Sequence, residues 1–174
     1  MRHFALVLAA CLLGAAPALA QSTGEKTGIN SALGVTPKTA DFVTEAAQSD
    51  MFEIASSKLA ASKVQGQVKA FADQMVGDHT KTTTELKPLA QKANVQLPTD
   101  MSSSQKSMLN KLNGLNGADF TKQYMDDQVS AHKDAVSLFQ RYGKGGDNKQ
   151  LAAWASKTLP TLQHHLDMAN KLDK

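Results

Sequence analysis

From Thr39 to the end of the chain, apolar residues recur three and four positions apart, which is the spacing of amphipathic α-helices. This spacing predicts four long helices, over residues 39–63, 66–93, 117–142 and 148–173. No segment shows the alternation of apolar and polar positions that is typical of a strand. The chain is therefore predicted to be all-α.

Short turns are predicted between the first two helices and between the last two. Gly66 marks the first turn, and the glycine-rich residues 143–146 mark the second. Thr39 is the predicted N-terminal cap of the first helix, and Asp147 or Asn148 is that of the fourth. Each pair of helices is therefore expected to form a tight hairpin.

The connection between the two hairpins is much longer. Residues 94–117 include a predicted short helix that begins at Ser102 or Ser103 and ends near Leu112. A connection of this length can run along the whole side of a bundle. Two hairpins joined by such a crossover are the ferritin-like arrangement of a four-helix bundle, which is the predicted fold.

The first 20 residues have the features of a secretory signal peptide. A short basic start precedes an apolar run over residues 4–16 and the small-residue site Ala18-Leu19-Ala20, so cleavage is predicted before Gln21. The apolar run is shorter than the roughly 20 residues that a transmembrane helix needs. The mature protein is therefore expected in the bacterial periplasm or outside the cell, with no transmembrane segment.

A competing interpretation of this leader involves Cys11. Residues 8–11, Leu-Ala-Ala-Cys, resemble a bacterial lipoprotein box, in which the Cys is lipidated and becomes the new N-terminus. Cleavage there would leave a very short apolar region before the site and an apolar start after it, so we favour the signal peptide of residues 1–20. Residues 21–37, rich in Gly, Ser, Thr and Asn, are a predicted flexible lead-in, and residues 38–174 are the bundle domain.

Composition and charge exclude several classes of protein. The chain has 19 Lys and Arg against 16 Asp and Glu, and the basic residues are scattered, so a nucleic-acid partner is not expected. The single Cys excludes an intrachain disulfide, a thiolate zinc site and a Cys-x-x-Cys redox motif. The motifs of serine hydrolases, P-loop proteins and dinucleotide-binding proteins are missing as well. The sequence therefore indicates no catalytic residues.

Helical periodicity places one ionisable side chain on the buried face of each long helix. Successive residues of a helix point about 100° apart, so the residues that share the apolar face can be identified from the sequence. The four ionisable residues on these faces are Glu53, His79, His132 and His165. His164, next to the last of them, faces away. Three of the five His therefore point into the predicted core.

One carboxylate and three imidazoles can hold one divalent transition metal ion, such as Fe, Zn, Mn, Cu or Ni. Tyr124, Gln128 and Asp78 are candidates for the outer hydrogen bonds that orient such ligands. Buried ionisable groups are costly unless they are paired or hydrogen-bonded. The competing hypothesis is that the four side chains form a metal-free polar core, satisfied by hydrogen bonds alone.

The heights of these residues along the bundle follow from counting along the helices from each turn. Glu53 and His79 fall within about 6 Å of each other, whereas His132 and His165 differ by about 10 Å at 1.5 Å per residue. A single site therefore requires a correction, for which a kink at Pro160 is the candidate. Pro88 is expected to end a segment of the second helix.

Several motifs resemble those of a widespread bacterial family of unknown function. They are Asp41-Phe42, Met75-Val76-x-Asp78-His79, Asp119-Phe120 and Leu159-Pro160-x-Leu162-x-x-His165-Leu166. The resemblance covers about residues 38–173. Members of this family are secreted, are ferritin-like in fold and are often labelled outer-membrane proteins. The resemblance implies the four-helix fold and a periplasmic or envelope location, but no reaction.

The sequence departs from ferritins and related di-iron proteins, because it contains no Glu-x-x-His motif. A di-iron ferroxidase is therefore not expected. Two functional hypotheses remain. The first is a periplasmic metal-binding protein with a role in protection against redox or other stress. The second is a non-catalytic envelope protein with a metal-free polar core, whose surface binds a protein partner or a second copy of the chain.

Overall fold

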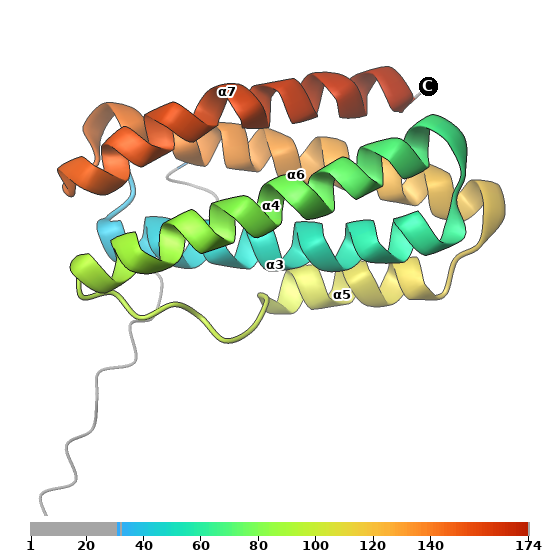
Figure 1. Ribbon diagram of the computed structural model, residues 1–174, viewed down its shortest axis with the longest axis horizontal. Coiled ribbons are helices and arrows are strands. Elements are labelled where there is room, and N and C mark those ends of the chain that lie inside the picture. Colours follow the sequence, from blue (N-terminus) through green and yellow to red (C-terminus); the bar gives the residue numbers. More distant parts are fainter. Residues whose placement is uncertain (1–30, 32, 174) are drawn as a thin grey trace, which may run out of the picture.

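The computed structural model describes residue 31 and residues 33–173, and within this part of the chain it contains helices and no strand. The helices, labelled as in Figure 1, are α3 (Thr39–Lys63), α4 (Gly66–Lys92), α5 (Ser103–Asn113), α6 (Gly117–Gly145) and α7 (Lys149–Leu172). The all-α prediction is thus confirmed for the described residues. The predicted signal peptide and most of the predicted lead-in lie outside them.

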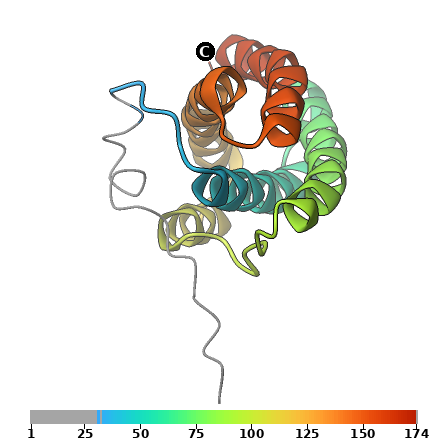
Figure 2. The same ribbon diagram turned by 90° about the vertical axis from the view of Figure 1, so that its left-hand side faces the viewer.

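The four long helices run side by side as two hairpins. α3 packs along α4, and α6 packs along α7. Seen end-on, the helices follow one another around the core in the order α3, α4, α7, α6 (Figure 2). The two hairpins therefore meet along two lines, one between α3 and α6 and one between α4 and α7, which we call the α3–α6 seam and the α4–α7 seam.

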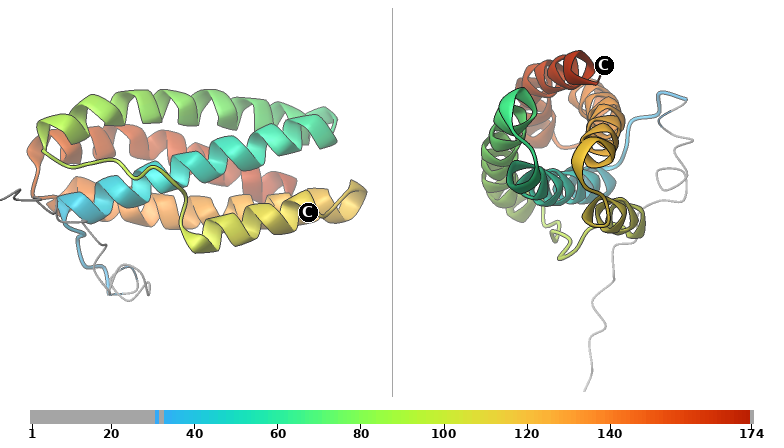
Figure 3. Two further views of the ribbon diagram at one scale, coloured as in Figure 1. Left: turned by 90° about the horizontal axis from the view of Figure 1, so that it is seen from below. Right: turned by 90° about the vertical axis from the view of Figure 1, so that its right-hand side faces the viewer.

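The long crossover makes these two seams different. It leaves the end of α4, crosses α3 and leads into α5, which lies outside the ring of long helices (Figures 2 and 3). α5 packs against both α3 and α6. A helix therefore covers part of the α3–α6 seam, whereas in the described part of the chain no helix lies over the α4–α7 seam.

Side-chain caps explain where two of the helices begin. Asn148 accepts hydrogen bonds from the backbone N–H groups of Gln150 and Leu151, each at 3.1 Å, and so caps α7 as predicted. Ser102 and Gln105 form a reciprocal capping box at the start of α5. The predicted helix limits agree with the observed ones to within three residues.

The prediction that Thr39 caps the first helix is wrong. The residue before α3 is Lys38, which makes no side-chain cap hydrogen bond. Thr39 instead reaches the turn between α6 and α7, where its backbone N–H donates to Asp147 Oδ1 at 3.1 Å. Its hydroxyl lies 2.6 Å from that of Tyr142. These contacts tie the start of α3 to the second hairpin.

α6 continues three residues beyond its predicted end, because Gly143 does not stop the helix. A Cβ atom on Gly143 would lie 2.6 Å from Ser156 Oγ and 3.3 Å from the Ser156 backbone nitrogen. The lack of a side chain at this position therefore allows α6 and α7 to approach closely.

Both prolines of the bundle lie inside helices rather than at their ends. α4 runs four residues past Pro88, so the prediction that Pro88 ends a segment is wrong, and α7 runs through Pro160. Proline has no amide hydrogen, so the carbonyls of Thr84 and Ser156 lack the helical partner that another residue would supply. Each helix is therefore weakened locally.

The core consists of two apolar clusters with a polar layer between them. One cluster includes Phe42, Leu86, Phe139 and Leu162, and the other includes Phe71, Met75, Phe120 and Ala169. Along each long helix, the predicted site residue (Glu53, His79, His132 or His165) falls between members of the two clusters. The polar layer is therefore enclosed by hydrocarbon above and below.

The last residues of the predicted lead-in contact α6. Arg141 donates a hydrogen bond to the carbonyl of Val35, and Pro37 is buried. Ser31 and Ser137 lie with their hydroxyl oxygens 3.0 Å apart. None of the helices in the described ranges combines the length and the apolar character needed to cross a membrane.

Candidate metal centre

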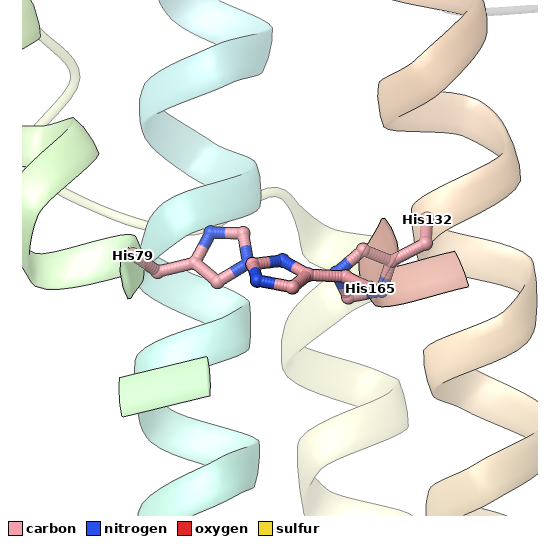
Figure 4. Close-up of side chains that lie close together, drawn as sticks. All are labelled: His79, His132 and His165. Carbon is pink, nitrogen blue, oxygen red and sulfur yellow. The ribbon is translucent and has the colours of Figure 1, made fainter. Parts of the chain in front are cut away.

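Three helices each bring one His to the middle of the bundle. His79 comes from α4, His132 from α6 and His165 from α7, and the side chains converge in Figure 4. Each residue is at most 2% exposed. One ring nitrogen of each His lies within 4.8 Å of those of the other two. The ring centroids are 5.4–5.6 Å apart. We call these three residues the His cluster.

On the side away from its neighbours, each ring is held by an oxygen atom. His79 Nδ1 lies 2.8 Å from Asp50 Oδ1, and His165 Nε2 lies 2.9 Å from Asp78 Oδ2. His132 Nδ1 lies 2.9 Å from the backbone carbonyl oxygen of Gln128. Carboxylates and carbonyls only accept hydrogen bonds, so each of these ring nitrogens must carry the proton. The outer bonds therefore determine the tautomer of all three rings.

The second nitrogen of each ring has no hydrogen-bond partner. These atoms are His79 Nε2, His132 Nε2 and His165 Nδ1, and all three are buried. In a neutral imidazole whose other nitrogen is protonated, this atom carries a lone pair. Buried nitrogen atoms are rarely left without a partner, because their desolvation is then uncompensated. Three such nitrogens, in rings that bring one nitrogen each within 4.8 Å of one another, form a candidate site for a cation.

The sequence predicted that His132 and His165 differ in height along the bundle by about 10 Å, and the structure does not show this difference. Because α6 extends to Gly145, His132 lies 13 residues before its end, and His165 lies 16 residues after the start of α7 at Lys149. The difference of three residues corresponds to about 4.5 Å rather than about 10 Å. Most of the correction therefore comes from the longer α6, and a kink at Pro160 is not needed to supply it.

Asp50 is a part of the site that the sequence analysis missed. It is buried on α3 and accepts hydrogen bonds from three side chains of α4: His79, Thr82 at 2.8 Å and Thr83 at 3.0 Å. The signal that could have found it is chemical: a His that binds a metal almost always donates its other N–H to an acceptor, and carboxylates are the strongest. Asp50 lies three residues before Glu53, at the edge of the predicted buried face of α3.

Glu53 lies beside the His cluster but does not belong to it. Its Oε1 is 4.0 Å from His132 Nδ1 and has no hydrogen-bond partner, whereas its Oε2 accepts a bond of 2.7 Å from the amide of Gln128. Burial raises the pKa of Glu53 to about 7, against the opposing effects of His79 and Gln128. The structure thus brings together three of the four predicted ligands and places the fourth next to them.

The three predicted outer residues have different positions. Asp78 contacts His165, and Gln128 contacts both His132, through its carbonyl, and Glu53, through its amide. Tyr124 contacts none of the three His. Its hydroxyl lies 2.8 Å from that of Ser57, and burial raises its pKa above the usual range.

Burial also changes the basicity of the His cluster. Burial and the proximity of His79 lower the pKa of His132 to about 4. Burial lowers the pKa of His165 to about 4 as well, although its bond to Asp78 acts in the opposite direction. For His79, burial is outweighed by Asp50 and Glu53, so its pKa is raised. At neutral pH, His132 and His165 are therefore uncharged, as metal ligands must be.

The charges around the cluster fit a divalent ion. With a metal ion bound, the three imidazoles would be neutral, and the outer carboxylates of Asp50 and Asp78 would balance two positive charges. The ring nitrogens lie within 4.8 Å of one another, so the rings would have to move closer together to hold one ion at the usual Zn–N distance of about 2.0–2.1 Å. A set of three imidazoles suits Zn, Fe, Cu and Ni better than Mg or Ca, which prefer oxygen ligands.

A family model described as "Domain of unknown function (DUF4142)" matches residues 24–172. The chain belongs to the DUF4142 family. The resemblance to a family of unknown function is thereby confirmed. Neither a curated protein nor a solved structure matches this DUF4142 chain. Membership of DUF4142 assigns no ligand or reaction, so the function must be argued from the geometry of the site.

Proposed function

We propose that this protein binds one divalent transition metal ion, of the Zn, Fe, Cu or Ni type, through His79, His132 and His165. The observation that carries the proposal is the arrangement of protons in the His cluster. All three outer nitrogens donate to oxygen atoms, and all three inner nitrogens are buried without a partner, in rings that bring one nitrogen each within 4.8 Å of one another. A core that existed only for packing would pair these atoms or replace them with hydrocarbon.

Glu53 is the proposed fourth group of the site. Its unpartnered oxygen lies next to the cluster, and a nearby dication would favour its ionised form. With Glu53 protonated, the site has three ligands, and with Glu53 ionised its negative charge would lie beside the bound ion. No residue of the site is proposed as a catalyst, and the role is the holding of a metal ion.

The proposed setting is the bacterial periplasm or envelope, and the proposed fold is ferritin-like. The location is supported by the signal-peptide features of residues 1–20. The fold is supported by the two hairpins and the long crossover. A protective role against metal or redox stress is consistent with a buried ion that is held without a substrate site.

The test is the metal content and metal affinity of the purified, untagged protein. The double variant His79→Ala/His165→Ala removes two ligands, and His164→Ala is its matched control, because His164 is exposed on the same helix as His165. We expect about one equivalent of metal in the wild type and in the control, and none in the double variant.

A second result would favour the alternative hypothesis. If the wild type and the double variant bind equally little metal, the His cluster is a polar core without a ligand. The double variant would then differ from the wild type only in its free energy of unfolding. A search for an envelope protein partner would be the next experiment in that case.

A further inference from the structure

The α4–α7 seam contains a small polar cleft of about 110 Å³. Its walls carry only charged and hydroxyl side chains: Asp78, Lys81, Thr82, Glu85, Lys157, Thr158 and Thr161. We call it the α4–α7 cleft. No apolar side chain contributes to this lining, which is unusual for a seam between two helices of a bundle.

The cleft leads to the outer hydrogen bonds of the His cluster. Asp78, in its lining, is bonded directly to His165. Thr82, also in its lining, donates to the Asp50 oxygen that holds His79. Two of the three imidazoles are therefore within one or two hydrogen bonds of the cleft.

Of the residues that hydrogen-bond the rings of the His cluster, the one at the α4–α7 cleft is the most exposed to solvent. The side chain of Asp78 is 38% exposed, whereas that of Asp50 is 8% exposed. Gln128, which holds His132, is fully buried. Asp78 is therefore the one outer partner that both touches a ring of the cluster and reaches solvent.

The opposite seam offers a larger approach. A groove of about 690 Å³ lies between α3, α5 and α6, and its lining combines apolar side chains such as Phe52 and Leu138 with polar ones such as Ser49 and Asp134. None of the groove's residues is bonded to a nitrogen of the His cluster. Its polar side chains therefore offer a cation no direct hydrogen-bonded route to the ring nitrogens, whereas Asp78 in the α4–α7 cleft does.

Both walls of the α4–α7 cleft are helices with a missing backbone hydrogen bond. Pro88 removes the bond to Thr84 in α4, and Pro160 removes the bond to Ser156 in α7. Both gaps lie within one turn of residues that line the cleft. Local opening of a helix costs less where its ladder of hydrogen bonds is already interrupted.

We propose that metal ions reach the His cluster through the α4–α7 cleft, with Asp78 as the carboxylate that first receives the ion. This inference rests on the proposed metal-binding function. Lys81 and Lys157 line the same cleft as Asp78 and Glu85, and the positive charges of the two lysines oppose the approach of a cation. The rate of uptake is therefore set at this cleft, while the affinity is set by the His cluster.

The test is the rate at which the metal-free protein takes up Co²⁺, measured by stopped-flow absorbance. Thr161→Trp places a large side chain at the exposed edge of the α4–α7 cleft, and Ser130→Trp does the same at the groove on the opposite seam. We expect Thr161→Trp to slow uptake at least about fivefold and to slow release by the same factor, because a blocked path leaves the affinity unchanged. Ser130→Trp should change neither rate.

Charge provides a second, independent measurement. Lys81→Glu/Lys157→Glu should speed uptake about tenfold at low salt, with a smaller effect at high salt. The control Lys58→Glu/Lys133→Glu makes the same change in net charge at exposed positions of α3 and α6 and should have a much smaller effect.

Three outcomes can be told apart. Slower uptake in Ser130→Trp than in Thr161→Trp, or equal rates in both, overturns the proposed path while leaving the metal site intact. Equal effects of the two charge variants also overturn it. No binding of Co²⁺ by the wild type overturns the proposed function itself. Circular dichroism of each variant verifies that it has folded.

Discussion

Within each imidazole of the His cluster, the partner of the outer nitrogen determines what the inner nitrogen can do. A hydrogen-bond acceptor next to the outer nitrogen holds the proton on that nitrogen. The inner nitrogen then carries a lone pair, since a neutral ring has only one N–H. Asp50 has the largest share in this, because it holds His79 and is itself held by two hydroxyl groups of α4. Single substitutions of the outer residues should therefore change the affinity for the metal ion.

Asp50→Asn should weaken metal binding about 10- to 100-fold. The change keeps the shape of the side chain but removes the negative charge that supports His79 and balances the ion. The matched control is Asp73→Asn, which removes a carboxylate from an exposed ion pair on α4. Isothermal titration with Zn²⁺ measures both affinities, and equal values for the two variants would contradict the role assigned to Asp50.

The metal-free protein should lose stability as the pH rises from 6.5 to 8. Folding raises the pKa of Glu53 from 4.5 to about 7 and also raises that of His79, so the folded state holds more protons in this range than the unfolded state. Stability of this kind is complete below the unfolded pKa and is lost as the pH passes the folded one. His132 and His165 have lowered pKa values, so their effect has the opposite sign; it falls mainly between pH 6.5 and about 4, and its upper end offsets part of the loss above pH 6.5.

The contribution of Glu53 over this range is about 1 kcal/mol. Urea unfolding at pH 6.5 and pH 8, in the presence of a chelator, measures the change. Glu53→Gln imitates the protonated side chain and should show a smaller loss. A metal-free wild type that gains stability over this range would show that Glu53 and His79 do not hold extra protons in the folded state.

At the scale of helices, the close contact between α6 and α7 at Gly143 sets the height of the His cluster. Because Gly143 has no side chain, α6 can pass close to α7 there and continue to Gly145, which brings His132 nearer to the height of His165. A glycine that normally interrupts a helix thus serves as a contact point between two helices. The contact can be tested without touching the site.

Gly143→Ala should destabilise the protein, whereas Gly77→Ala should stabilise it. Alanine favours a helix by about 1 kcal/mol over glycine, and Gly77 has open space around it. At Gly143 the new methyl group would meet Ser156, including its backbone, at a cost of about 1–3 kcal/mol. Thermal or urea unfolding of the two variants should therefore differ by about 2 kcal/mol, and equal stability would show that α7 can move aside.

The periodicity of the sequence was sufficient to place the three His on the buried faces of their helices. The face on which a residue in the middle of a long amphipathic helix lies does not depend on where that helix begins or ends. The periodicity was not sufficient for Asp50, which points about 60° away from Glu53 and is buried only because α4 packs against that side of α3. The height of His132 along the bundle could not be predicted from the periodicity either. It depends on Gly143, whose contact with Ser156 joins residues of two different helices.

Considered as a whole, the molecule is two hairpins that share one polar layer. The first hairpin contributes His79 and Glu53, and the second contributes His132 and His165. A metal ion at the His cluster would therefore bind only when both hairpins are packed together. Its binding free energy would be available to the folded state and not to the separate hairpins.

Metal should therefore raise the melting temperature of the whole bundle. At a free metal concentration 100 times the dissociation constant, the gain is about 2.7 kcal/mol. Calorimetry of the wild type with added Zn²⁺ and with a chelator measures it, and the His79→Ala/His165→Ala variant should melt at the same temperature in both. An upward shift in that variant would indicate a different binding site.

The three His of the cluster lie far apart in the sequence, on three different helices, so a bound ion would link distant parts of the chain. An ion bound to His79, His132 and His165 would close loops of roughly 50 and 30 residues, the kind of closure that secreted proteins obtain from disulfides. This chain has one Cys and can form no intrachain disulfide. A coordinated metal would give it an equivalent cross-link, one that a reductant leaves in place and that a chelator or an acidic medium releases.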